Sequence, residues 1–182
     1  MLIRRSMDRN SVQGRLGEIA VIEFLQSLGY SIFPASESLP EQTGPRIHEA
    51  NSNEKTVTPD LLVWDGEKQF WIEVKTKSSF SWNRNLRKWT TGIDTRYLEQ
   101  YIKVDATTPW RVYVLFIQMG ISRRDDPPGK RQPRGVYSNS VRELLKSESH
   151  RFGHMVYWTI DSLTRIADLT DGIITAYNSK QL

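Results

Sequence analysis

The chain of 182 residues contains no cysteine. This absence excludes disulfides, thiolate metal centres and cysteine nucleophiles, and it is typical of proteins from a reducing compartment. No apolar run is long enough to span a bilayer, and the opening residues MLIRRSMDRN lack the apolar stretch of a secretory signal. We therefore expect a cytoplasmic protein that has no membrane partner.

Histidine is scarce, and the common hydrolase motifs are missing. His48, His150 and His154 do not have the spacing of a zinc motif such as HExxH, and no serine lies in a GxSxG sequence. We interpret the three histidines as surface or structural residues. No catalytic apparatus in the sequence competes with the acidic residues described below.

The charge balance is moderately basic. There are 25 Lys and Arg residues against 21 Asp and Glu residues, a formal net charge of +4. Such a balance suits a polyanionic partner without requiring one. The length fits one domain, assigned to residues 1–182, with a core at about 11–118 and a C-terminal extension at 119–182.

Apolar periodicity places the main elements of the first half. It predicts a helix from Leu16 to Leu28 that ends at Gly29, and then a short strand in YSIFPA. The composition of residues 36–55 predicts a long loop. The runs TVTPDLLVW and EKQFWIEVKTK predict two strands of a hairpin that turns around Asp65-Gly66.

Further elements follow the hairpin. The basic, aromatic segment SFSWNRNLRKWTTG leads into a predicted helix in IDTRYLEQYIKVDA and a buried strand in RVYVLFIQ. A charged loop, SRRDDPPGKRQPRG, precedes a short helix near SVRELLKSES, a strand in HMVYWTI and a last helix with Asp161 as its N-cap. This order predicts an α/β fold with helices against the faces of a sheet.

The predicted hairpin carries acids where apolar residues would be expected. Strand alternation puts Asp60 and Glu73 on the same face as Lys75. A turn centred on Gly66-Glu67 places Asp60 directly opposite Glu73, whereas a turn centred on Asp65-Gly66 makes the two residues diagonal. In either register the carboxylates lie roughly 5–8 Å apart.

Two facing carboxylates are destabilising unless a cation lies between them. Mg²⁺ is a natural neutraliser, since it binds through one or two carboxylates together with waters and phosphates. The alternative is an amphipathic hairpin whose polar face is simply solvated. Pro59 marks a strand start just before Asp60, and Trp64 and Trp71 on the acids' face argue against a freely solvated surface.

Glu18 is a third acid in an unusual position. On the first predicted helix it lies on the same side as Val21, Ile22 and Leu25. A carboxylate within an apolar arc is costly unless it is paired, protonated or near a metal. The alternative is that Glu18 only interacts with the positive end of the helix dipole.

The ordered set of Glu18, Pro59-Asp60 and Glu73-Val74-Lys75 resembles the PD-(D/E)xK nuclease superfamily. The resemblance covers roughly residues 11–118 and implies a restriction-endonuclease-like αβββαβ core, with a mixed central sheet flanked by helices. Archaeal-type Holliday-junction resolvases, restriction-endonuclease-like proteins and nucleases of phages or mobile elements are all similar, and the sequence does not choose among them.

The resemblance also implies roles for individual residues. Asp60 and Glu73, with the backbone carbonyl of Val74, would ligate Mg²⁺, for which Mn²⁺ would substitute; Glu18 would bind a second metal or a metal-bound water. Lys75 would position and help deprotonate the attacking water and offset charge on the phosphate, and Lys77 could replace it in part. Members of the superfamily often carry a Gln or Tyr on the following helix, where the candidates are Tyr97, Gln100 and Tyr101.

Nucleic-acid contacts are predicted in basic segments that also contain aromatic residues, since cations bind phosphates and rings stack on bases. The first segment comprises Trp82, Arg84, Arg87, Lys88 and Trp89. The second comprises Arg123, Arg124, Lys130, Arg131 and Arg134, and a third arm comprises Arg4, Arg5 and Arg9. The alternative for each segment is a solvated basic loop.

These observations predict a metal-dependent nuclease that hydrolyses phosphodiester bonds in DNA. The alternative is a catalytically inactive nucleic-acid-binding or accessory protein on the same fold. A homodimer is plausible because paired cuts need two active sites.

Overall fold

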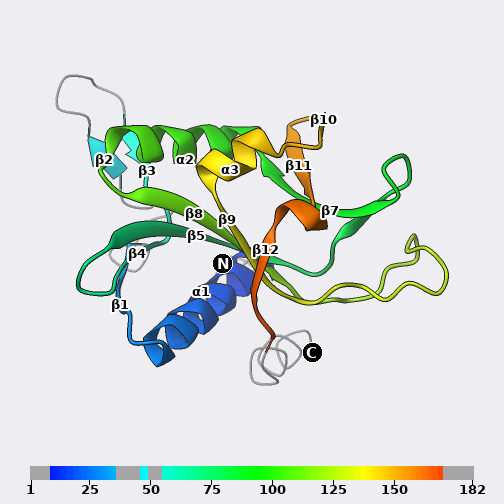
Figure 1. The fold of residues 1–182 in the computed structure, drawn as a ribbon, viewed down its shortest axis with the longest axis horizontal. Coiled ribbons are helices and arrows are strands. Elements are labelled where there is room, and N and C mark those ends of the chain that lie inside the picture. The colour runs from blue at the N-terminus through cyan, green and yellow to red at the C-terminus, as the bar shows by residue number, and fades with distance from the viewer. Residues whose placement is uncertain (1–8, 36–45, 49–54, 170–182) are drawn as a thin grey trace, which may run out of the picture.

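The computed structural model describes residues 9–35, 46–48 and 55–169, and its centre is a six-stranded mixed sheet (Figure 1). The strand order is β1 (Ser31–Pro34), β4 (Leu61–Trp64), β5 (Gln69–Lys77), β8 (Arg111–Gln118), β9 (Gly135–Ser140) and β12 (Thr164–Ala167). Strands β5 and β8 are parallel, and every other neighbouring pair in this sheet is antiparallel. The α/β class and the mixed sheet agree with the prediction.

Helices cover both faces of this sheet (Figure 1). The helix α1 (Arg9–Ser27) packs on one face through Val21 and Leu25, against residues of β4, β5 and β8 that include Val63 and Val74. The helices α2 (Thr95–Thr107) and α3 (Val141–Lys146) pack on the other. Alternation along β5 divides its side chains between the two layers, because successive residues of a strand point to opposite faces.

Two smaller sheets complete the described chain. One pairs β2 (Arg46–His48) with β3 (Lys55–Val57), and β3 packs against α2. The other has the order β10 (His150–Phe152), β11 (Met155–Thr159), β7 (Lys88–Asp94) and β6 (Ser81–Asn83). No helix in the described ranges is long and apolar enough to cross a membrane.

Several predicted elements are confirmed. The first helix ends at Ser27, and Gly29 follows with a φ of 87°, but the helix begins at Arg9, earlier than the predicted Leu16. The strand after Gly29, the hairpin, the helix α2, the strand β8, the helix α3 and the strand β11 all lie in the predicted segments. The described residues of the predicted 36–55 loop include β2 and the first residue of β3, and the rest of that loop lies outside the described chain.

The predicted last helix at Asp161 is wrong. Asp161 lies in a short 3-10 turn, Ile160–Ser162, and the chain then extends as β12 and pairs with β9. The β-branched residues Thr164 and Ile166 favour a strand, and the free edge of β9 offers them a partner. A single capping residue cannot outweigh that pairing.

The helix α1 approaches the sheet closely at Gly17, where a methyl group would overlap the Thr76 hydroxyl oxygen. We predict that Gly17→Ala lowers stability, because overpacking costs about 1–3 kcal/mol, more than the gain of about 1 kcal/mol in helix propensity. Gly14→Ala is the matched control, since nothing lies within 4 Å of a Cβ there. Urea unfolding should show the control at or above wild-type stability; a stabilised Gly17→Ala would contradict this packing.

Candidate active site

The register of the β4–β5 hairpin determines where the acids lie. Leu61 pairs with Ile72 and Val63 with Phe70, and the Asp65 amide donates to the Lys68 carbonyl at 3.2 Å. This is the register with Gly66-Glu67 at the centre of the turn, and Gly66 has a φ of 96°. It places Asp60, the residue directly before β4, opposite Glu73.

Asp60 is fixed by the backbone of the neighbouring strand. Its Oδ2 accepts a hydrogen bond from the Val74 amide at 2.8 Å, just before the first residue of β4. The amide and carbonyl of one residue in an antiparallel ladder point to the same side of the strand. The Val74 carbonyl is therefore directed toward the side of β5 on which Asp60 lies.

Glu73 is held from the side of α2. It is 5% exposed, and its Oε1 accepts a hydrogen bond from the Tyr101 hydroxyl at 2.5 Å. The same oxygen forms an ion pair with the Lys75 Nζ. That Nζ lies 5.1 Å from the ring centroid of Tyr97 and 5.7 Å from that of Tyr101. The two tyrosines therefore line the side of the Glu73–Lys75 pair.

Burial and like charges dominate the electrostatics of these residues. Burial, followed by the charges of Glu73 and Glu18, raises the pKa of Asp60 well above its usual range. Burial lowers the pKa of Lys75, but the charge and hydrogen bond of Glu73 outweigh it, so the pKa is raised and the amine stays protonated at neutral pH. Burial and Glu73 also raise the pKa of Tyr101, so its hydroxyl remains a donor.

Glu18 lies on α1, in the layer opposite the one that holds Glu73. The apolar arc predicted for its helix is confirmed, since Val21 and Leu25 lie in the core between α1 and the sheet. Glu18 is half-buried, and its charge is among the causes that raise the pKa of Asp60. Asp60 directly precedes β4, and the charges of both Glu73 on β5 and Glu18 on α1 act on it.

The donors present suit a hard divalent cation. Within the described ranges, no group of three or more His, Cys, Asp or Glu side chains is placed so that it could hold a metal ion. Asp60, Glu73 and the Val74 carbonyl instead supply oxygen donors on one side only. Mg²⁺ is commonly held in this way, through one or two carboxylates with its remaining positions left to waters and phosphates.

The first basic segment forms the β6–β7 hairpin. Arg84 and Arg87 are exposed at its turn, and Lys88 pairs with Asp161 at 2.6 Å. Trp89 is 8% exposed and packs edge-on against Trp82, with ring centroids 5.1 Å apart. The Trp89 ring belongs to the core and is not available to stack on a base, contrary to the predicted contact.

The second basic segment lies beside the first. All five of its arginines and lysines, Arg123, Arg124, Lys130, Arg131 and Arg134, are exposed. The Lys130 Nζ lies 4.3 Å from the Trp82 ring centroid, and Arg123 donates from Nη1 to the Ser81 Oγ at 3.1 Å. Residues 40 or more positions apart in the chain thus form one basic surface, which the sequence did not indicate.

The remaining candidates separate into structural and undescribed residues. The Gln100 Oε1 accepts a hydrogen bond from the Val57 amide at 3.2 Å, so this side chain fastens β3 to α2 and is not directed at the acids. Arg134 is exposed, with its Nη2 3.5 Å from the Leu169 carbonyl. Arg4, Arg5 and the side chain of Arg9 lie outside the described residues.

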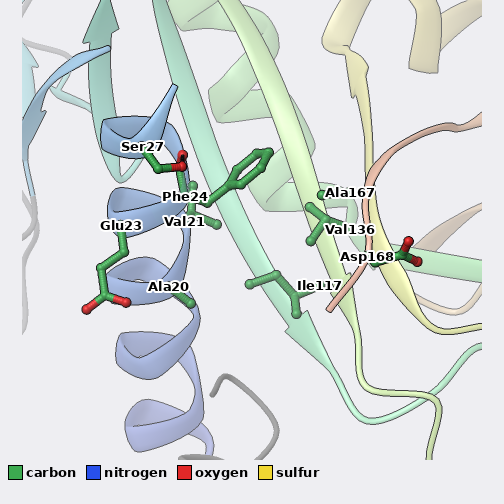
Figure 2. Close-up of a pocket in the computed structure, with 9 residues that line it drawn as sticks. All are labelled: Ala20, Val21, Glu23, Phe24, Ser27, Ile117, Val136, Ala167 and Asp168. Carbon is green, nitrogen blue, oxygen red and sulfur yellow. Dashed lines mark hydrogen bonds between the residues drawn. The ribbon is translucent and has the colours of Figure 1, made fainter. Parts of the chain in front are cut away.

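A separate hollow of about 230 Å³ lies between α1 and the strands β8, β9 and β12. Figure 2 shows Phe24, Val21 and Ile117 around this gap. Its charged lining residues, Glu23 and Asp168, are both acidic and would repel a phosphate. This hollow is apolar and lies on the face of the sheet opposite Glu73 and Lys75.

The fold is a restriction-endonuclease-like α/β fold. It is defined by the antiparallel β4–β5 hairpin, the helix α2 and the strand β8, which is parallel to β5. Among solved structures, the chain is similar to Hjc of Archaeoglobus fulgidus, a Holliday junction resolvase from an archaeal hyperthermophile, with a TM-score of 0.50 and 12% identity over 85% of this chain and 92% of that one. The resemblance to the PD-(D/E)xK nucleases drawn from the sequence is therefore confirmed at the level of the fold.

A second solved structure is D212, a nuclease from a fusselovirus, with a TM-score of 0.40 and 12% identity over 92% of both chains. No family model matches the sequence, and no curated protein does.

Proposed function

We propose that the protein is a Mg²⁺-dependent nuclease that hydrolyses phosphodiester bonds in DNA, and that Mn²⁺ can replace Mg²⁺. The observation that carries the proposal is the placement of Asp60, directly before β4, opposite Glu73, with Lys75 paired to Glu73. The fold shared with a Holliday junction resolvase supports it. So does the basic surface formed by the two segments around Trp82.

The chain holds the proposed donors in place before any ligand arrives. The Val74 amide orients Asp60, and the Tyr101 hydroxyl orients Glu73, so neither carboxylate needs to reorganise during the reaction. A divalent cation bound by these carboxylates would neutralise the phosphate and activate a water. The Val74 carbonyl would complete the protein's share of the donors.

Lys75 and Glu18 take the remaining roles. The protonated Lys75 amine would stabilise the negative charge that develops on the phosphoryl oxygens. Glu18, which approaches Asp60 from the α1 layer, would hold and orient the attacking water. In the reaction, the oxygen of water forms a bond to phosphorus, and the bond from phosphorus to one sugar oxygen breaks. The attacking water loses a proton to the solvent, and the leaving sugar oxygen takes one from it.

A substrate panel tests the proposal. We expect cutting of linear duplex, single-stranded or four-way-junction DNA with Mg²⁺ or Mn²⁺, none with EDTA, and weaker cutting of matched RNA. Glu73→Gln should abolish cutting, whereas Glu67→Gln, an exposed residue of the same hairpin, should not change it. Cutting that persists in EDTA or in Glu73→Gln would refute the mechanism. Binding to DNA without cutting any substrate would favour the inactive nucleic-acid-binding alternative.

Two copies of the chain would give the paired cuts that a junction or duplex needs, so we include a homodimer in the proposal. Light scattering of the protein with and without DNA measures the number of copies directly.

A further inference from the structure

A polar hollow of about 220 Å³ lies beyond Lys75, at the C-terminal end of β5 and beside the four-stranded sheet. Two of its lining side chains are cationic, Lys77 and Arg123, and no carboxylate lines it among the residues that the structure describes. Its other lining residues include Ser79, Ser81 and Thr91, each of which carries a hydroxyl. Cations and hydroxyl donors without an acid are the chemistry of an anion site.

Of the two cations that line the hollow, Lys77 is the nearer to Glu73 along the chain. It is half-buried, and no acidic partner pairs with its amine within the described residues. Burial and the neighbouring Lys75 lower the pKa of Lys77, as expected for an amine without a counter-ion. A partly buried charge is costly unless it is paired, so an anion in the hollow would stabilise this side chain.

The hydroxyls around Lys77 have donor capacity to spare. The Ser79 Oγ is buried and has no hydrogen-bond partner within the described chain. The Thr91 Oγ1 accepts a hydrogen bond from the Gln118 Nε2 at 2.9 Å, which leaves its own proton to donate. Arg123 donates from Nη1 to the Ser81 Oγ at 3.1 Å, while its Nε pairs with the exposed Asp125 at 3.4 Å. Lys77 is therefore the cation of the hollow without an acidic partner among the described residues. The hollow therefore offers donors from several elements to one group.

Its position relative to the acids suggests which group that is. Residues on one face of a strand recur every second position, at about 6.6 Å, so Lys77 lies one such step beyond Lys75, whose amine is proposed to act on the phosphate that is cut. This spacing is of the order of the separation between successive phosphates along a polynucleotide. The bound anion and the phosphate at Asp60 and Glu73 can therefore belong to the same strand.

We propose that this hollow binds the phosphodiester group next to the one that is cut, with Lys77 as its main cation. The inference rests on the proposed function for the position of that phosphate. Such a site would set the register of the DNA strand over Asp60 and Glu73, and so would determine which bond is hydrolysed.

The test is binding of a labelled four-way junction and a labelled duplex in EDTA, measured by fluorescence anisotropy across a salt series. Lys77→Met should weaken binding several-fold and reduce the slope of log K against log[salt] by about 1. Lys146→Met, which removes an exposed charge on α3, should leave both values unchanged. A Lys77→Met protein with wild-type affinity and slope would overturn the proposal.

A scan of single methylphosphonate substitutions identifies the phosphate. At one phosphate next to the scissile bond, the neutral methylphosphonate should weaken DNA binding by the wild type and leave DNA binding by Lys77→Met unchanged. If every position weakens both proteins equally, the hollow is not a phosphate site. Thermal melting checks that Lys77→Met is folded, and Ser79→Ala, which removes an unpartnered hydroxyl, should show a smaller loss at the same position.

Binding in EDTA does not depend on cutting, so the two proposals fail separately. A wild type that shows the Lys77 signature but cuts no substrate would defeat the nuclease and leave the phosphate site standing. A wild type that cuts DNA, while Lys77→Met keeps wild-type affinity and slope, would defeat the phosphate site alone.

Discussion

Lys75→Met is expected to reduce the rate of DNA cleavage by about 10³-fold at saturating Mg²⁺. Methionine keeps the length of the side chain but removes the charge that Lys75 places beside Glu73 and over the rings of Tyr97 and Tyr101. Because that charge acts on the developing phosphoryl charge, its loss should appear in the single-turnover rate much more than in DNA affinity.

The matched control is Lys68→Met, which removes an exposed lysine at the turn of the same hairpin and should cleave at the wild-type rate. Binding of both variants to a substrate in Ca²⁺ should stay within a few-fold of wild type. If Lys75→Met keeps its single-turnover rate to within about tenfold, Lys75 serves only as the counter-ion of Glu73, and the electrostatic role assigned to it is wrong.

Much of the geometry around Lys75 follows from local sequence signals. Alternating apolar residues in β5 separate Ile72 and Val74 from Glu73 and Lys75, and Gly66 marks the position of the turn. Sequence alone left two registers open, because Asp65-Gly66 and Gly66-Glu67 are both acceptable turn centres. The pairing of Leu61 with Ile72 decides between them.

The support for Glu73 was harder to predict. Tyr101 belongs to the buried stripe of α2 with Leu98 and Val104, so its position follows the helical period. That stripe directs Tyr101 toward the sheet, whereas Gln100 lies to one side and meets the Val57 amide. Nothing in the local spacing shows that the Tyr101 hydroxyl would find Glu73, which is 28 residues away.

The four-stranded sheet depends on long-range pairing. Thr91 on β7 pairs with Trp158 on β11, although the intervening chain includes α2, β8, β9 and α3. The short β6–β7 hairpin has no clear apolar alternation, and its turn depends on Arg87 with a φ of 53°. Such pairings are decided by tertiary contacts, so the sequence predicted only a basic aromatic segment there.

Asp60→Asn is expected to stabilise the metal-free protein while it removes the response to Mg²⁺. The side-chain oxygen of the introduced asparagine can still accept the Val74 amide, but the repulsion from Glu73 and Glu18 is lost. Relief of a facing like-charge pair contributes roughly 1 kcal/mol, or about 2–4 °C in Tm for a chain of this size. Differential scanning calorimetry in EDTA measures the shift.

The stability difference between Asp60→Asn and the wild type should change with pH in one direction. The pKa of Asp60 is raised in the folded state, so the folded protein binds more protons than the unfolded one between the two pKa values. Wild-type stability therefore falls as pH rises through that window and stays lower above it. The advantage of Asp60→Asn should be largest at and above the raised pKa and should shrink as pH falls toward about 4, the value for an unfolded Asp.

Mg²⁺ should reverse the order of the Tm values of the wild type and Asp60→Asn. A ligand that binds only the folded state stabilises it by about 2.7 kcal/mol at about 100 times Kd, so wild-type Tm should rise past that of Asp60→Asn, which lacks one of the two carboxylates. Asp65→Asn, at the exposed turn, should respond to Mg²⁺ as the wild type does. If Mg²⁺ raises the Tm of Asp60→Asn as much as that of wild type, the cation binds elsewhere, and the repulsion around Asp60 has some purpose other than holding a metal.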